Sequence, residues 1–240
     1  MNIVKRAIIM AAGIGKRMQP VTYDIPKPLV PVNGTRMIDS VIQALHENGI
    51  NEIYVVVGYK KEMFNILSDS YDGITIIENP WYATCNNISS LYVAREHLEE
   101  SMILDGDQLI LNSKVLNPEF TYSGYNAVWT EAPTCEWLMQ TNDGMIISCS
   151  RTGGKHGWQL YSISRWSKSD GIKLKHYLEI EFEENRNSQI YWDDVAMFCH
   201  FEEFNLGITP MNREDVLEID DYDELCAIDK SYINYKGGLK

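Results

Sequence analysis

Two glycines and two basic side chains lie close together near the N-terminus. Gly13 and Gly15 follow an apolar run, Arg17 comes two residues later, and Lys27 stands between two prolines. Glycines at the carboxyl end of a parallel strand let backbone N–H groups turn toward phosphate oxygens, and Arg and Lys add positive charge. Met18 replaces the third glycine of a Rossmann fingerprint, and the Walker pattern is absent. The two glycines alone would also fit a plain turn, but with the cations they predict a site for a phosphate-bearing ligand.

Acidic side chains form a second group. Asp105 and Asp107 flank a glycine directly after a short apolar run. Mg²⁺ prefers one or two carboxylates together with phosphate oxygens and water, and two phosphates brought together on an acidic protein require a divalent cation. We therefore expect Asp107 to be a Mg²⁺ ligand, with a solvated acidic turn as the alternative reading.

A polar segment over residues 79–91 leads into a helical pattern and contains several asparagines. An Asn amide can accept a hydrogen bond from an exocyclic amine and donate one to a ring carbonyl, which complements the N4 donor and O2 acceptor of cytosine. Asn87 is also suited to cap the helix that follows.

Aromatic residues beside carboxylates recur in the second half, at Glu136-Trp137, at Tyr191-Trp192-Asp193 and near Glu218. A quaternary ammonium has no N–H group to donate, so its recognition depends on aromatic faces and nearby negative charge. Taken singly, an aromatic side chain in a region of strands is more often part of the core.

The elements that would position these residues change in character along the chain. In the first half we expect strands at 6–12, 52–57, 74–77 and 102–104, and helices at 37–45, 61–70 and 88–100. Strands that are apolar on both faces and alternate with helices are typical of a parallel sheet covered by helices.

After about residue 120 the pattern changes to short strands, at 126–130, 136–141, 145–150 and 158–163, followed by a helix over 168–184 and a last helix after residue 221. The prediction is an α/β fold with a Rossmann-like, mixed, mainly parallel sheet flanked by helices and an antiparallel elaboration in the C-terminal half. With no linker or repeat, residues 1–240 are expected to form one domain with halves 1–120 and 121–240.

Composition excludes several classes of protein. The 240 residues are 45% hydrophobic and 23% charged, as in ordinary globular proteins, and the net charge of −13 argues against a nucleic-acid binder. The five cysteines form no C-x-x-C pair, so neither a disulfide framework nor a zinc site is indicated. No apolar run approaches the length of a membrane span or resembles a secretory signal. We expect a cytoplasmic protein that binds neither membrane nor nucleic acid, with a homodimer as one possible state.

Three motifs together resemble the nucleotidyltransferase superfamily, which activates sugar phosphates and alcohol phosphates with NTPs. They are A-A-G-x-G-x-R-M-x-P from residue 11, I-P-K-P-L-V-P-V from residue 25, and D-x-D at 105–107. The resemblance implies that residues 1–120 bind the NTP and residues 121–240 the acceptor. It implies catalytic roles for Arg17 and Lys27, Arg17 on the β and γ phosphates and Lys27 at the reacting centre. It also implies a second metal carboxylate, for which we favour Asp220 over Asp193. The nucleotide-binding set expected in this part of the chain is Ala11, Ala12, Gly13, Gly15, Lys16 and Asp105.

The form N-x-x-Y-A-x-x-N-N-x-x-S-L from residue 79 resembles the CTP-using branch, particularly bacterial choline-phosphate cytidylyltransferases. That resemblance places Asn86, Asn87 and Ser90 near the base or ribose. It implies an acceptor box formed by Trp137, Tyr191 and Trp192, with negative charge from Asp193 or Glu218.

The sequence therefore predicts a cytidylyltransferase that converts CTP and phosphocholine into CDP-choline and pyrophosphate with Mg²⁺. The acceptor is already an anion, so it can attack the α-phosphorus without a general base, and catalysis reduces to positioning and charge stabilisation. The alternative acceptors are 2-aminoethylphosphonate, whose primary ammonium can donate hydrogen bonds, and sugar 1-phosphates. A glycosyltransferase with a metal-binding D-x-D is the alternative from another reaction class. It would have no departing pyrophosphate for Arg17 and Lys27 to neutralise.

Overall fold

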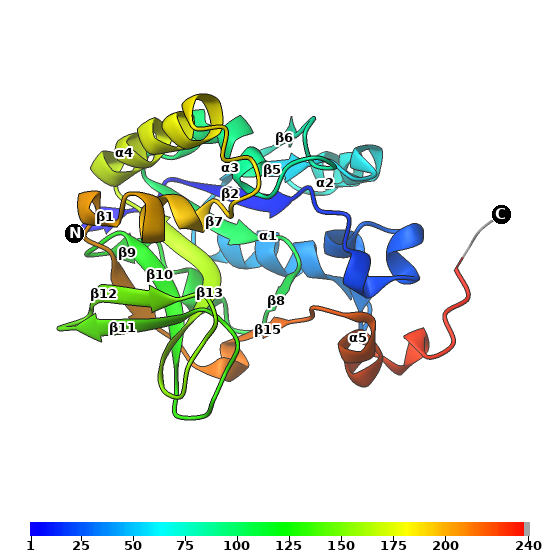
Figure 1. Cartoon of the computed structure of the whole chain (residues 1–240). Coiled ribbons are helices and arrows are strands. Elements are labelled where there is room, and N and C mark those ends of the chain that lie inside the picture. The colour runs from blue at the N-terminus through cyan, green and yellow to red at the C-terminus, as the bar shows by residue number, and fades with distance from the viewer. Residues whose placement is uncertain (238–240) are drawn as a thin grey trace.

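The computed structural model describes residues 1–237, and a nine-stranded sheet with helices on both faces lies at its centre (Figure 1). Four strands of the first half run parallel in the order β7 (Ser101–Asp105), β2 (Arg6–Ala11), β5 (Glu52–Val57) and β6 (Ile74–Glu78). Their apolar, largely β-branched runs suit strands that are covered on both faces. The predicted α/β class and the parallel first half are confirmed.

Alternate side chains of β2 enter two separate apolar layers, because successive residues of a strand point to opposite faces. Ala7 and Ile9 pack in the layer that contains α1 (Met37–Glu47). Ile8 and Met10 pack in the layer that contains α3 (Ile88–Val93) and α4 (Lys168–Glu179). A continuous apolar run is therefore what a central strand of this sheet requires.

Most predicted helices are confirmed, and one is shorter than predicted. The 61–70 segment is a 3₁₀ turn followed by α2 (Asn65–Ser70), and α4 continues into a π-helical turn over Ile180–Glu184. The continuous helix predicted over 88–100 is wrong, because α3 ends at Val93 and only a 3₁₀ turn follows at Arg95–His97. Residues 94–100 instead form the connection that reverses the direction of the chain before β7 begins at Ser101.

The antiparallel elaboration of the second half is confirmed. It comprises β10 (Gly124–Thr130), β11 (Leu138–Asn142), β12 (Met145–Ser150) and β13 (Gly157–Trp166). The last strand, β14 (Gly207–Pro210), pairs antiparallel with β12 but parallel with β10. Strand β13 pairs antiparallel with β10 on one side. On its other side it pairs antiparallel with β11 near its start and with β7 near its end, so the two halves share one sheet. Among residues 1–237, no helix is long and apolar enough to cross a membrane.

Three short antiparallel pairs lie outside the main sheet. They are β1 (Asn2–Ile3) with β9 (Glu119–Phe120), β3 (Pro31–Val32) with β4 (Thr35–Arg36), and β8 (Gln108–Ile110) with β15 (Val216–Glu218). The last pair matters for the site, because it sets Glu218 opposite Gln108 and so carries the C-terminal acidic segment to the end of β7. The short α5 (Tyr222–Ile228) then packs Leu225 against Met18 in a third apolar cluster, beside the N-terminal loops (Figure 1).

Candidate active site

The glycine loop after β2 is shaped by one left-handed residue. Gly15 has φ +67°, and a Cβ there would lie 2.9 Å from Cγ2 of Thr22 and 3.1 Å from Cβ of Lys27. The Thr22 hydroxyl donates to the Gly15 carbonyl at 2.8 Å. Only glycine fits both the backbone conformation and this close approach. Arg17 follows on a 3₁₀ turn (Lys16–Met18) whose Met18 side chain is fully buried.

Lys27 lies at the centre of a network of ion pairs. Lys27 is only 8% exposed and begins a 3₁₀ turn (Lys27–Leu29). The Nζ atom lies 2.6 Å from Oδ2 of Asp107 and 3.6 Å from Oδ1 of Asp220, and Nη2 of Arg17 lies 3.0 Å from the same Asp220 oxygen. Burial opposes the charged ammonium, but the attraction of Asp107 and Asp220 outweighs it and raises the pKa of Lys27.

Two cavities meet at this network. The larger, about 470 Å³, is lined by the glycine loop and by residues of the 79–87 loop. The smaller, about 290 Å³, extends toward the antiparallel half and is lined by residues such as Trp137, Tyr191 and Asp193. The shared wall, as we call it below, is formed by the residues that line both cavities: Arg17, Lys27, Asp107 and Asp220.

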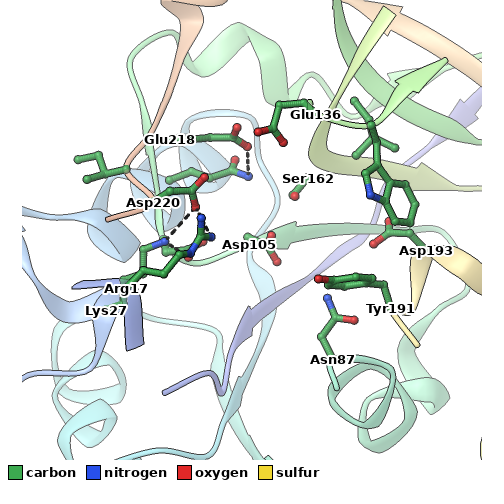
Figure 2. A pocket seen from close by; sticks show the side chains of 15 residues that line it. Arg17, Lys27, Asn87, Asp105, Glu136, Ser162, Tyr191, Asp193, Glu218 and Asp220 are labelled. Carbon is green, nitrogen blue, oxygen red and sulfur yellow. Dashed lines mark hydrogen bonds and ion pairs between the residues drawn. The ribbon is translucent and has the colours of Figure 1, made fainter. Parts of the chain in front are cut away.

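The smaller cavity is strongly acidic, because six carboxylates line it against only two cations. These carboxylates belong to Asp105, Asp107, Glu136, Asp193, Glu218 and Asp220, and the cations to Arg17 and Lys27. In Figure 2, Arg17, Lys27 and Asp220 gather at one side and Tyr191 and Asp193 at the other, with Asp105 and Ser162 between them.

The acidic groups raise one another's pKa. Burial, and then the charge of Asp107, raise the pKa of Asp105 to about 7. Burial, and then the charges of Asp105 and Asp107, raise the pKa of Glu218 to about 8. Burial and Asp105 likewise raise the pKa of Asp193 well above its usual value. Carboxylates held this close favour the uptake of a cation.

The described residues contain no group of three or more His, Cys, Asp or Glu side chains arranged to hold a metal by themselves. Asp107 and Asp220 nevertheless both contact Lys27 and line both cavities. Two carboxylates beside a site for phosphate oxygens is the donor set that Mg²⁺ accepts, since it keeps waters and substrate oxygens as its other ligands.

The residues predicted to bind nucleotide fall into three positions. Ala11, Gly13, Gly15 and Lys16 line the larger cavity, Ala12 is buried behind it, and Asp105 lines the smaller cavity instead. The 79–87 loop contributes different residues from those predicted, since its members at the larger cavity are Tyr82, Ala83 and Cys85. The Tyr82 side chain packs closely against Gly58, which directly follows β5. A Cβ on Gly58 would lie 2.5 Å from the Tyr82 side chain.

Asn86, Asn87 and Ser90 do not line the larger cavity. The Asn87 Oδ1 atom accepts a hydrogen bond from the Trp192 backbone N–H at 2.9 Å, its side chain makes no capping bond, and it lines the smaller cavity. Ser90 is buried and accepts from Nδ2 of Asn79 at 2.9 Å. Asn86 bonds to residues 188 and 189. Their position near the base stays a prediction, and of the three only Asn87 lines either of the two cavities.

Of the predicted acceptor box, Trp137, Tyr191, Asp193 and Glu218 line the smaller cavity. The rings of Trp137 and Tyr191 are perpendicular, with centroids 5.8 Å apart. The placement of Trp192 in the box is wrong, because this residue is 4% exposed and its ring packs in the core, 6.1 Å from the rings of Tyr125 and Trp166. Ser162, for which no role was predicted, also lines the cavity.

The chain is similar to several known proteins. The family model described as nucleotidyl transferase matches residues 6–120. The chain is 37% identical to a 2-aminoethylphosphonate cytidylyltransferase of Lancefieldella rimae over 95% of this chain and 93% of that protein. It is 32% identical to a choline-phosphate cytidylyltransferase of Streptococcus pneumoniae over 94% and 99% of the two chains. A solved structure of CTP:phosphocholine cytidylyltransferase from Streptococcus pneumoniae superposes with a TM-score of 0.87 at 30% identity, covering 94% of this chain and 98% of that one.

Proposed function

The chain belongs to the nucleotidyl transferase family, in its cytidylyltransferase branch, and from this premise we propose that it transfers CMP from CTP to a small phosphonate or phosphate that carries a cationic amine. The observation that carries the proposal is the shared wall of Arg17, Lys27, Asp107 and Asp220 between two cavities of different character. A triphosphate in the larger cavity and an acceptor in the smaller one would meet at that wall.

The proposed reaction balances without a general base. An oxygen of the acceptor's phosphoryl group forms a bond to the α-phosphorus of CTP, the bond from that phosphorus to the α,β-bridging oxygen breaks, and pyrophosphate leaves with the electron pair. No histidine among the described residues lines either cavity. The requirement is to hold two anions in line and to neutralise the charge that develops, which suits Lys27 and Arg17.

We propose that Mg²⁺ is the cofactor and that Asp107 and Asp220 hold it. The donor chemistry fits, since both carboxylates reach the shared wall and now contact only cations of the protein there. Bound Mg²⁺ supplies charge neutralisation for phosphoryl oxygens. With both carboxylates engaged, Arg17 and Lys27 lose their acidic partners and become available to phosphate oxygens.

For the acceptor we favour 2-aminoethylphosphonate. Since Trp192 is in the core, only Trp137 and Tyr191 are left of the three predicted rings. Besides the two carboxylates assigned to Mg²⁺, four others line the smaller cavity, those of Asp105, Glu136, Asp193 and Glu218. A primary ammonium donates N–H bonds to carboxylates, and a quaternary ammonium cannot. Phosphocholine is the second candidate, favoured by the perpendicular Trp137–Tyr191 pair, since aromatic faces bind quaternary ammonium groups.

The remaining alternatives have less support. A sugar 1-phosphate carries no cation to match the four carboxylates of the smaller cavity that are not assigned to Mg²⁺. A glycosyltransferase is disfavoured, because the relatives are named cytidylyltransferases. The cytoplasmic location and the homodimer stay predictions.

A pyrophosphate-release assay would test the proposal, with the four common NTPs crossed against 2-aminoethylphosphonate, phosphocholine and a hexose 1-phosphate. We expect release only with CTP, and a higher kcat/KM for 2-aminoethylphosphonate than for phosphocholine. A preference for phosphocholine would select the second candidate. The proposed function would be refuted if pyrophosphate were released only with the hexose 1-phosphate. It would also be refuted if neither 2-aminoethylphosphonate nor phosphocholine gave release.

A further inference from the structure

A set of hydrogen bonds ties the 79–87 loop to the segment that carries Tyr191 and Asp193. The Asn86 backbone N–H donates to the Ser188 carbonyl at 2.8 Å, and Nδ2 of Asn86 donates to the Gln189 carbonyl at 3.1 Å. In the other direction, Nε2 of Gln189 donates to the Thr84 carbonyl at 2.9 Å. We call these three bonds the Asn86–Gln189 bridge.

The two bridged segments face different cavities. Tyr82, Ala83 and Cys85 of the loop line the larger cavity, whereas Tyr191 and Asp193 line the smaller one. Asn86 and Gln189 themselves line neither cavity. Neither residue is therefore placed to contact a substrate. Their three hydrogen bonds instead join the two segments to each other.

The rest of the loop is anchored at its ends. At the C-terminal end, the Asn87 Oδ1 atom accepts a hydrogen bond from the Trp192 backbone N–H at 2.9 Å. At the N-terminal end, buried Asn79 donates to Ser89 and Ser90, and the Trp81 ring lies 5.4 Å from that of Phe182. Ala83 and Thr84 are exposed. Within residues 1–237, every hydrogen bond that joins Thr84–Asn86 to a part of the chain distant in sequence ends on Ser188 or Gln189. The position of the middle of the loop therefore depends on the bridge.

We propose that the Asn86–Gln189 bridge couples the two substrate sites, with Gln189 as a positioning residue. A nucleotide in the larger cavity contacts and holds the 79–87 loop. The bridge passes that restraint to residues 188–193, so that Tyr191 and Asp193 are already ordered when the acceptor arrives. Because both ligands favour the same bridged arrangement, each raises the affinity for the other. The inference rests on the proposed function, since it requires a nucleotide in the larger cavity and an acceptor in the smaller one.

The first test needs only the nucleotide. Hydrogen exchange is measured on the peptide covering residues 188–194, with and without the unreactive α,β-methylene analogue of CTP. We expect the analogue to slow exchange there in the wild type, and Gln189→Ala to remove at least half of that protection. The matched control is Gln140→Ala, because Nε2 of Gln140 also donates to a backbone carbonyl at 2.9 Å, that of His156, and lines neither cavity. Equal protection in wild type and Gln189→Ala, or no protection in the wild type, would overturn the coupling.

The second test measures the coupling itself. Calorimetry gives the Kd of the analogue with and without saturating acceptor, using 2-aminoethylphosphonate and phosphocholine separately. We expect the acceptor to tighten the analogue by about tenfold in the wild type, within the usual range for coupled sites, and by about threefold or less in Gln189→Ala. Gln189→Glu keeps the length of the side chain but removes the N–H donor, so it should behave like Gln189→Ala, while Gln140→Ala keeps the wild-type ratio. A ratio of one in the wild type, or an unchanged ratio in both Gln189 variants, refutes the coupling. Failure of the analogue, or of both acceptors, to bind refutes the proposed function instead.

Discussion

The larger and the smaller cavity of the site are built in different ways. At the larger cavity, the glycine loop and its cations come from one stretch of fifteen residues, 13–27, after β2, and backbone conformation shapes the glycine loop. At the smaller cavity, Trp137, Tyr191 and Glu218 come from three segments far apart in the sequence, and tertiary packing fixes them. Local sequence therefore specifies the first part closely, whereas the second part depends on which side chains the core leaves uncovered.

The largest expected effect falls on the shared wall, where the two parts meet. If Asp107 and Asp220 hold Mg²⁺, EDTA should abolish pyrophosphate release, because two phosphoryl groups would then approach without a neutralising cation. Addition of Mg²⁺ in excess of EDTA should restore the rate. The assay is the same pyrophosphate-release measurement, and full activity in EDTA would contradict the proposed role of both carboxylates.

Removal of the Lys27 ammonium should come next in size. In Lys27→Met the side chain stays apolar and long, but the contacts to Asp107 and to the reacting phosphates are lost, so kcat should fall by about a hundredfold or more. Lys61→Met is the matched control, since Nζ of Lys61 forms an ion pair of 2.7 Å with Glu78 at the surface, and such pairs contribute little. A kcat for Lys27→Met close to that of the control would remove Lys27 from the reacting centre.

A pair of tryptophans sharpens the contrast on the acceptor side. Trp137→Ala should raise the KM for the acceptor by about tenfold and leave the KM for CTP unchanged, since one desolvated ring contributes about 1–2 kcal/mol to cation binding. Trp192→Phe should leave both KM values unchanged and lower the free energy of unfolding by about 1–3 kcal/mol, because the smaller ring leaves a cavity beside Tyr125 and Trp166. Steady-state kinetics and urea unfolding measure the two effects. Equal shifts in both KM values for Trp137→Ala would exclude an acceptor-specific role.

These tryptophans also mark how far the sequence could be read. Apolar runs predicted every strand of the nine-stranded sheet except β14, and the glycine loop follows β2 as predicted, because strand periodicity and a left-handed glycine are local properties. Trp192 and Tyr191 are neighbours on a short segment, but the Trp192 side chain lies in the core and the Tyr191 side chain lines the smaller cavity. No local sequence pattern indicates which of the two neighbours faces the cavity. The same applies to Glu218 and Asp105, which meet only because β8 pairs with β15 and β7 with β2.

The smallest expected effects are those of substitutions in the 79–87 loop and α3. They distinguish Ser90 from Tyr82 as the residue near the base. If Ser90 contacted the base, Ser90→Ala would raise the KM for CTP. In the structure its hydroxyl instead accepts one of two hydrogen bonds from Nδ2 of Asn79, and the other goes to Ser89 at 3.0 Å. Since that second bond survives, Ser90→Ala should cost only about 1 kcal/mol of unfolding free energy and leave the KM for CTP unchanged. Tyr82→Leu, which alters a side chain at the larger cavity, should instead raise the KM for CTP several-fold, and the reverse pattern would return the base to Ser90.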